Sequence, residues 1–178
     1  PDAGGQQIGV DYAFLDTDPA GTPARWPCTP TGLSIALNPT GPVPGDAATQ
    51  LTHALATLTA VTGRALHLSP DPERADITVA YTTATLDNSE TVAGLARTRI
   101  SSAHVITHAA ITVRTGLDAR AHQHVLLHEL GHALGASHAD TPDALMAPTY
   151  SPTASPTTSD TFTAGDQYAL TTLGCPHP

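Results

Sequence analysis

Three histidines and one glutamate between residues 124 and 146 have the types and spacing needed for metal chemistry. His128, Glu129 and His132 form the pattern HExxH, and His138 follows in the sequence GHALGASH. On an α-helix, His128 and His132 lie one turn apart on the same face, so both imidazoles can reach a single ion. Three neutral nitrogen ligands suit a tetrahedral Zn²⁺ whose fourth position is left for water. The spacing therefore predicts one catalytic zinc ion.

Two further residues in this stretch have the properties that such a site requires. Glu129 follows the first ligand, so its carboxylate can sit beside the water and take its proton. Gly135 has no Cβ, so it can adopt the positive φ that ends a helix and reverses the chain. This reversal would bring His138 back to the ion as the third ligand.

The longer pattern HExxHxxGxxH, followed by Leu145, Met146, Pro148 and Tyr150, resembles the metzincin clan of zinc endopeptidases and its matrixin-like branch in particular. The resemblance implies that Met146 forms an apolar floor under the histidines without binding the metal. It also implies that Pro148 and Tyr150 form the wall of the substrate pocket. His124 then takes the floor of the pocket for the residue after the scissile bond, which its imidazole would make polar or shallow.

Hydrophobic periodicity predicts the elements that must position these residues. We expect strands at 33–38, 65–69, 76–83, 91–100 and 104–115, and helices at 46–63, 118–134 and 163–173. Asp46, Asp118 and Thr163 are expected to be the N-caps of these helices. A strand, a crossover helix and further strands imply a mixed α/β sheet. The fold class implied by the resemblance is a zincin-like α/β (α+β) fold. It has a twisted five-stranded mixed sheet with two helices, a small irregular C-terminal subdomain with one helix, and an active-site cleft between them.

The same resemblance predicts a single catalytic domain over residues 1–178, with an N-terminal subdomain to about 135 and a C-terminal subdomain over about 136–178. One strand of the sheet is expected to be antiparallel and to form the rim of the cleft. Our candidate lies within 92–100, around Ala93 to Ala96. A protein or peptide substrate would pair with that edge as an added strand.

Composition limits the other partners. The net charge is −9, and all seven basic residues are arginines without a cluster, which disfavours nucleic acid or an anionic membrane. The unbroken aliphatic runs are too short to span a bilayer. We expect a monomer that acts on peptides.

Cys28 and Cys175 are the only cysteines and lie near opposite ends of the sequence. They are either two free buried thiols or one disulfide, and an even cysteine count with a Pro-, Thr- and Ser-rich composition favours the disulfide and a secreted, extracellular protein. The first residue is Pro1, so we expect a processed N-terminus.

Several alternatives stay open at this point. A calcium ion could use Asp16 and Asp18, although turn carboxylates in solvent are the favoured explanation and no clear motif supports calcium. Asp140 could hold a metal ligand in place or cap the next turn. His104 and His108 are interpreted as solvated strand residues. The protein could also be a catalytically silent zincin-fold binding module, or hold a structural zinc closed by His124 or Cys28.

Overall fold

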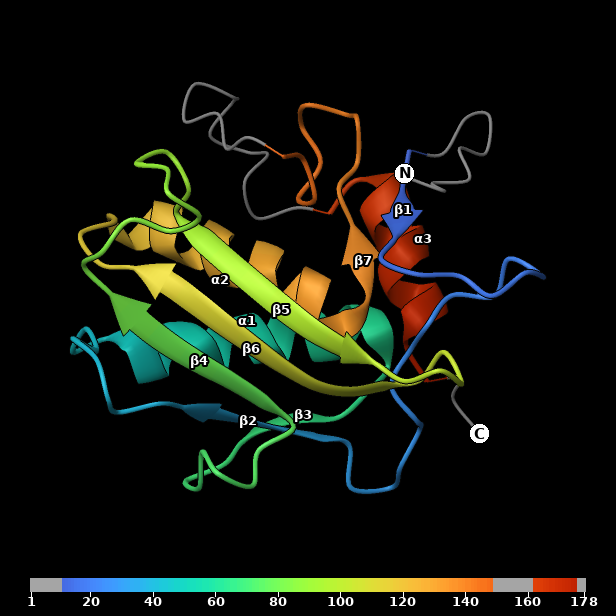
Figure 1. Cartoon of the computed structure of the whole chain (residues 1–178), viewed down its shortest axis with the longest axis horizontal. Coiled ribbons are helices and arrows are strands. Elements are labelled where there is room, and N and C mark those ends of the chain that lie inside the picture. The colour runs from blue at the N-terminus through green and yellow to red at the C-terminus, as the bar shows by residue number, and fades with distance from the viewer. Residues whose placement is uncertain (1–10, 149–161, 176–178) are drawn as a thin grey trace.

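The computed structural model of the chain describes residues 11–148 and 162–175, and a five-stranded sheet lies at its centre (Figure 1). The strand order is β3-β2-β4-β6-β5. The strands are β2 Leu33–Leu37, β3 Leu66–Leu68, β4 Ile77–Thr82, β5 Gly94–Ile100 and β6 Ile106–Arg114. The pairs β2–β3, β2–β4 and β4–β6 are parallel, whereas β5 is antiparallel to β6. The mixed sheet and its antiparallel edge strand are therefore confirmed.

One face of this sheet is covered by the helices α1 (Ala47–Thr62) and α2 (Ala119–Leu134), which lie behind it in Figure 1. Side chains alternate along the strands, so every second one points to the helices. In the two central strands these inward residues are Ile77, Val79, Tyr81, Ala109, Ile111 and Val113, and all are buried in one core with residues of both helices. The opposite face of the sheet carries neither helix.

The helix ends follow from specific residues. Asp118 caps α2 because its side chain accepts a hydrogen bond from the N–H of Ala121 at 2.8 Å, as predicted. Gly63 ends α1 with a φ of 64°. Asp46 was expected to cap α1, but its side chain makes no capping hydrogen bond, because its own backbone is already helical. That detail of the prediction is wrong.

Residues 11–32 form an irregular arm that is attached to the helices by its polar groups. Trp26 is buried and its indole N–H donates to the carbonyl of Ala133 at 2.8 Å. Arg64 is buried and donates to the carbonyls of Trp26 and Pro27. A disulfide joins Cys28 to Cys175, so the arm is also tied covalently to the segment just beyond the C-terminal cap of the last helix, α3 (Ala164–Leu173).

The arm makes one short strand pairing, between β1 (Ala13–Phe14) and β7 (Ala136–Ser137). The interpretation of His104 as a strand residue is wrong. It lies in the turn between β5 and β6 with a φ of 53°, and its Nδ1 is 2.9 Å from a carboxylate oxygen of Asp16. A turn is needed there because β6 must reverse direction to pair with β5.

Candidate metal centre

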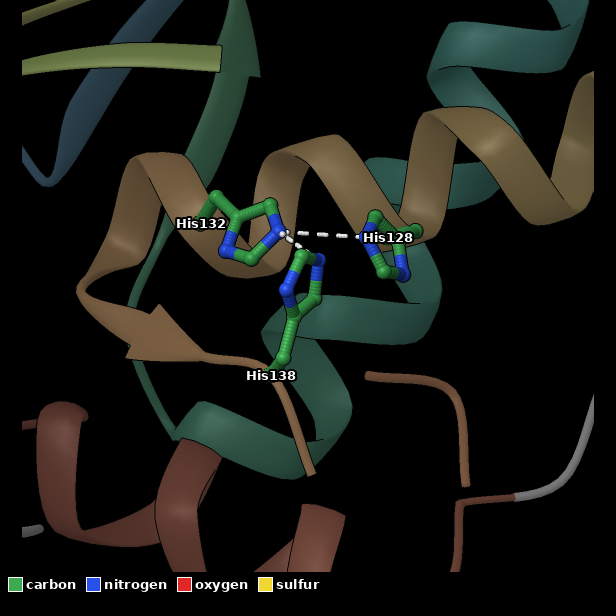
Figure 2. Close-up of side chains that lie close together, drawn as sticks. All are labelled: His128, His132 and His138. Carbon is green, nitrogen blue, oxygen red and sulfur yellow. Dashed lines mark hydrogen bonds between the residues drawn. The ribbon is translucent and has the colours of Figure 1, made fainter. Parts of the chain in front are cut away.

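The three predicted histidine ligands meet at one point (Figure 2). His128 and His132 project from successive turns of α2, and His138 reaches them from the segment after β7. The Nε2 atom of His132 lies 3.1 Å from that of His128 and 3.2 Å from that of His138. Tetrahedral zinc with bonds of about 2.0–2.1 Å to nitrogen separates its ligand atoms by about 3.3–3.4 Å. The observed separations are close to that value, so the three residues fit a zinc ion.

Hydrogen bonds on the far side of two rings determine which nitrogen faces the ion. The Nδ1 of His128 is 2.7 Å from the carbonyl oxygen of Leu145, and the Nδ1 of His132 is 2.8 Å from that of Ala136. A carbonyl can only accept, so each Nδ1 carries the proton and each Nε2 presents a lone pair. Lone pairs this close repel one another, and a cation between them removes the repulsion.

Burial keeps these rings in the neutral form that binds metal. Desolvation lowers the pKa of His128 to about 3, with neighbouring imidazoles contributing, and lowers the pKa of His132 to about 4. The pKa of the more exposed His138 is lowered in the same direction by burial. All three are therefore ready to bind a metal ion near neutral pH without first losing a proton.

The chain reversal that delivers His138 depends on Gly135. Its φ is 118°, and a Cβ there would lie 2.9 Å from the carbonyl oxygen of Ala24 and 3.0 Å from a methyl group of Leu173. Both the backbone conformation and the space thus require glycine. The reversed segment is then held by the arm, because β7 pairs with β1 and the N–H of Leu15 donates to the carbonyl of Gly135 at 2.9 Å.

Glu129 follows the first histidine of the group on α2 and is 5 % exposed. Desolvation raises the pKa of its carboxyl group to about 7, while a hydrogen bond from the backbone N–H of Ala96 acts in the opposite direction. A carboxylate with a pKa near neutrality can both take and return a proton at physiological pH. Glu129 therefore has the environment that a general base requires.

Glycine 94, on the edge strand β5, leaves the space that Glu129 occupies. A Cβ on Gly94 would lie 2.6 Å from both Cγ and Oε1 of Glu129, and 2.7 Å from a methyl group of Val125. A carbon atom does not approach other nonbonded heavy atoms this closely. The missing side chain thus forms a notch in the edge strand, and the carboxylate sits in it.

Met146 is buried against Gly131, which lies between His128 and His132 in the sequence of α2. A Cβ on Gly131 would lie 2.5 Å from the sulfur of Met146. We call residues 144–147 the Met turn. Its backbone is held by the buried carboxylate of Asp166, which accepts from the N–H of Leu145 at 2.8 Å and from that of Met146 at 3.2 Å. Leu145 in turn supplies the carbonyl that orients His128.

The remaining predicted residues fall into separate places. His124 is buried one turn before His128, with ring centroids 6.3 Å apart, and is not part of the three-histidine group. Pro148 is exposed, and Tyr150 lies outside the described residues. Cys28 is in the disulfide and cannot be a metal ligand. Among residues 11–148 and 162–175, the three histidines are the one group arranged to hold a metal, so calcium at Asp16 and Asp18 gains no support.

Three supporting residues were not identified from the sequence: Gly94, Asp166 as a support of the Met turn, and Asp11. Asp11 lies next to the third ligand, because its carboxylate accepts from the N–H of Asp140 at 3.1 Å and from the hydroxyl of Thr141. Each of these contacts joins segments far apart in the chain, so no local pattern indicates it. For Asp166, the capping box with Thr163 was a signal that the residue would be buried and bonded.

Comparison with known proteins agrees with this geometry. A family model described as Matrixin matches residues 43–173, which include all three histidines, Glu129 and the Met turn. A search of curated proteins gives no match. In the described part of the chain, no helix combines the length and the hydropathy that crossing a lipid bilayer would need.

Proposed function

The chain belongs to the matrixin family of zinc metallopeptidases, and from this premise we propose that it is an active zinc-dependent endopeptidase that cleaves extracellular proteins. The observation that carries the proposal is the convergence of His128, His132 and His138 with Glu129 buried beside them. Met146 and the Met turn serve as the floor of this site. Pro148, Tyr150 and His124 are assigned to the substrate pocket by the same family pattern.

A zinc ion held by His128, His132 and His138 would supply a Lewis acid able to polarise the scissile carbonyl and to lower the pKa of a water molecule. Glu129 takes a proton from that water as the nucleophile adds to the carbonyl carbon. It then delivers the proton to the nitrogen of the leaving amine as the peptide bond breaks. Burial raises the pKa of Glu129 above that of a free carboxyl group, and this higher proton affinity favours uptake of the proton from the water.

An extended peptide would bind along the free edge of β5. The carbonyl of Ala93 accepts a hydrogen bond from the backbone N–H of Arg114. Backbone groups alternate in direction along a strand, so the odd-numbered residues of β5 direct theirs to β6. The N–H of Ala96 faces Glu129 instead. The backbone groups of Gly94, Ala96 and Thr98 are therefore directed to the free edge, where an added strand can pair with them.

Secretion and a monomeric state belong to the same proposal. The Cys28–Cys175 disulfide supports an oxidising compartment, where such bonds persist. All ligands and Glu129 come from one chain, so no second subunit is needed for the site. We also assign residues up to about 135 to an N-terminal subdomain and residues 136–178 to a C-terminal one, with the substrate between them.

A cleavage assay on a diverse peptide library tests the proposal. We expect cleavage that stops with a chelator and returns with zinc. Glu129→Gln should retain zinc and lose about 10²–10⁴-fold in turnover. Full zinc occupancy without any cleavage would instead support a catalytically silent binding module, and full activity in Glu129→Gln would refute the assignment of the base.

A further inference from the structure

Positive charge is concentrated on the edge of the sheet where substrate is proposed to bind. The five strands contain three arginines and no aspartate or glutamate, although the whole chain carries a net charge of −9. Two of these arginines, Arg97 and Arg99, are on β5, and both are exposed. The strand that would contact a peptide thus has the opposite charge to the protein as a whole.

Arg97 and Arg99 lie on the face of the sheet away from α1 and α2. Their direct neighbours on β6 are Ala110 and His108, whereas the inward residues Ala96 and Thr98 pair with the buried Ile111 and Ala109. Side chains of directly paired residues share a face, so the two guanidinium groups project from the helix-free side.

Neither guanidinium is neutralised within the described residues. The ion pair found there joins His104 to Asp16, and no carboxylate lies within ion-pair distance of Arg97 or Arg99. The third strand arginine, Arg114, differs because its guanidinium donates to the backbone carbonyl of Glu90. The two edge arginines therefore have their full donor capacity available to a bound peptide.

The arginines are also close to the reacting groups. Ala96, which precedes Arg97, directs its N–H at Glu129, and the hydroxyl of Thr98 donates to the carbonyl of His132 at 3.3 Å. A peptide paired with β5 at the catalytic site would therefore run past both arginines. Its side chains that share their face would have Cβ atoms about 4.5–5.5 Å from those of Arg97 and Arg99.

We propose, on the basis of the proposed function, that Arg97 and Arg99 select peptides with aspartate or glutamate two residues apart on one side of the cleaved bond. Alternation along the bound strand places such a pair on the helix-free face, one opposite each arginine. The net negative charge of the chain opposes this choice only at long range. At physiological ionic strength the Debye length is about 8 Å, so the adjacent arginines dominate.

The first measurement is a cleavage assay with peptides that carry acidic residues or the matching amides at each position around the cut. We expect the acidic peptides to have the higher kcat/KM at two positions separated by one residue. We call kcat/KM for the acidic peptide divided by kcat/KM for the matching amide peptide, or the same quotient of affinities, the acid-to-amide ratio. Arg97→Gln and Arg99→Gln should each reduce this ratio about two- to fivefold, which corresponds to the free energy of an exposed cross-strand charge pair. Arg74→Gln is the matched control, because it removes an exposed charge between β3 and β4, at the other side of the sheet.

A binding measurement separates this inference from the proposed function. In zinc-loaded Glu129→Gln protein, fluorescence anisotropy reports peptide affinity without turnover, so the acid-to-amide ratio can be read even if no peptide is cleaved. The ratio should fall in both arginine variants, stay unchanged in Arg74→Gln, and disappear near 1 M salt. The proposal would be overturned by an acid-to-amide ratio near one in Glu129→Gln protein that keeps both arginines. It would also be overturned if neither arginine substitution changed the ratio, and these residues would then be solvated edge charges.

Discussion

Replacing Gly94 with alanine should reduce turnover while leaving the metal site intact. The added methyl carbon would lie 2.6 Å from Cγ and Oε1 of Glu129, where ordinary contacts between heavy atoms are about 3.5–4.0 Å. The carboxylate must therefore move by about 1 Å, and a displacement of about that size can cost about 10²-fold in rate. We expect kcat to fall about 100-fold with little change in KM or zinc affinity, because the three atoms nearest to the added methyl group belong to Glu129 and Val125 and not to a metal ligand.

Steady-state kinetics with a fluorogenic peptide, together with zinc titration, check this expectation. Gly45→Ala is the control, because a Cβ at Gly45 would have no atom within 4 Å. A Gly94→Ala enzyme with kcat within about threefold of the parent would refute the reasoning, since the rate loss expected from a displacement of this size is about 10²-fold.

The free energies of unfolding of the parent, Gly94→Ala, Glu129→Ala and the double variant test the contact between position 94 and Glu129 independently of catalysis. Gly94→Ala should cost more free energy of unfolding in the parent than in a Glu129→Ala background, where the crowded carboxylate is gone. The contact with Val125 remains in both backgrounds and so cancels in the comparison. An equal cost in the two backgrounds would mean that Glu129 does not occupy the notch.

Three further perturbations follow from the same structure. Asp166→Asn should lower the free energy of unfolding by about 3 kcal/mol. The asparagine side chain has one oxygen, so it cannot accept all the hydrogen bonds that the two carboxylate oxygens accept from the N–H groups of the Met turn and of Thr163. Chemical denaturation measures this loss, and a value below about 1 kcal/mol would contradict the expectation. Replacing both Cys28 and Cys175 with serine opens a bridge between residues 147 apart and should cost about 5 kcal/mol in the chain-entropy model; an unchanged melting temperature would be inconsistent with this. In metal-free protein the pKa of Glu129 is raised from 4.5 to about 7, so the folded state keeps a proton that the unfolded chain releases, and stability should fall by up to about 3 kcal/mol as the pH rises between these values. Metal-free Glu129→Gln should lack this fall and so gain relative to the parent from about pH 4 to about pH 8; a difference between the two proteins that does not vary with pH would refute the cause assigned to the shift.

The metal ligands could be predicted from the sequence because their geometry is local. His128 and His132 are neighbours by helical periodicity alone, and Gly135 is adjacent to the reversal that it permits. The sheet was equally accessible, since its central strands β4 and β6 alternate buried and partly buried residues along most of their length. The disulfide needed tertiary information, because Cys28 and Cys175 lie 147 residues apart.

The contacts of Gly94 and Asp11 that support the site could not be predicted from the sequence, because they too depend on tertiary packing. The notch at Gly94 exists only because β5 packs across α2 at Glu129, and no periodicity encodes that crossing. Asp11 reaches the third ligand's neighbours through the pairing of two strands of two residues each, too short to leave a pattern. His104 was misassigned because the β-rich segment around it continues to both sides of the turn.

Counting the ligands of the bound metal tests the central claim most directly. X-ray absorption at the zinc edge of the loaded protein should show three imidazole nitrogens and one further light atom from solvent at about 2.0–2.1 Å. Four imidazoles, which would require His124 to join the other three, would close the site and contradict the proposed peptidase.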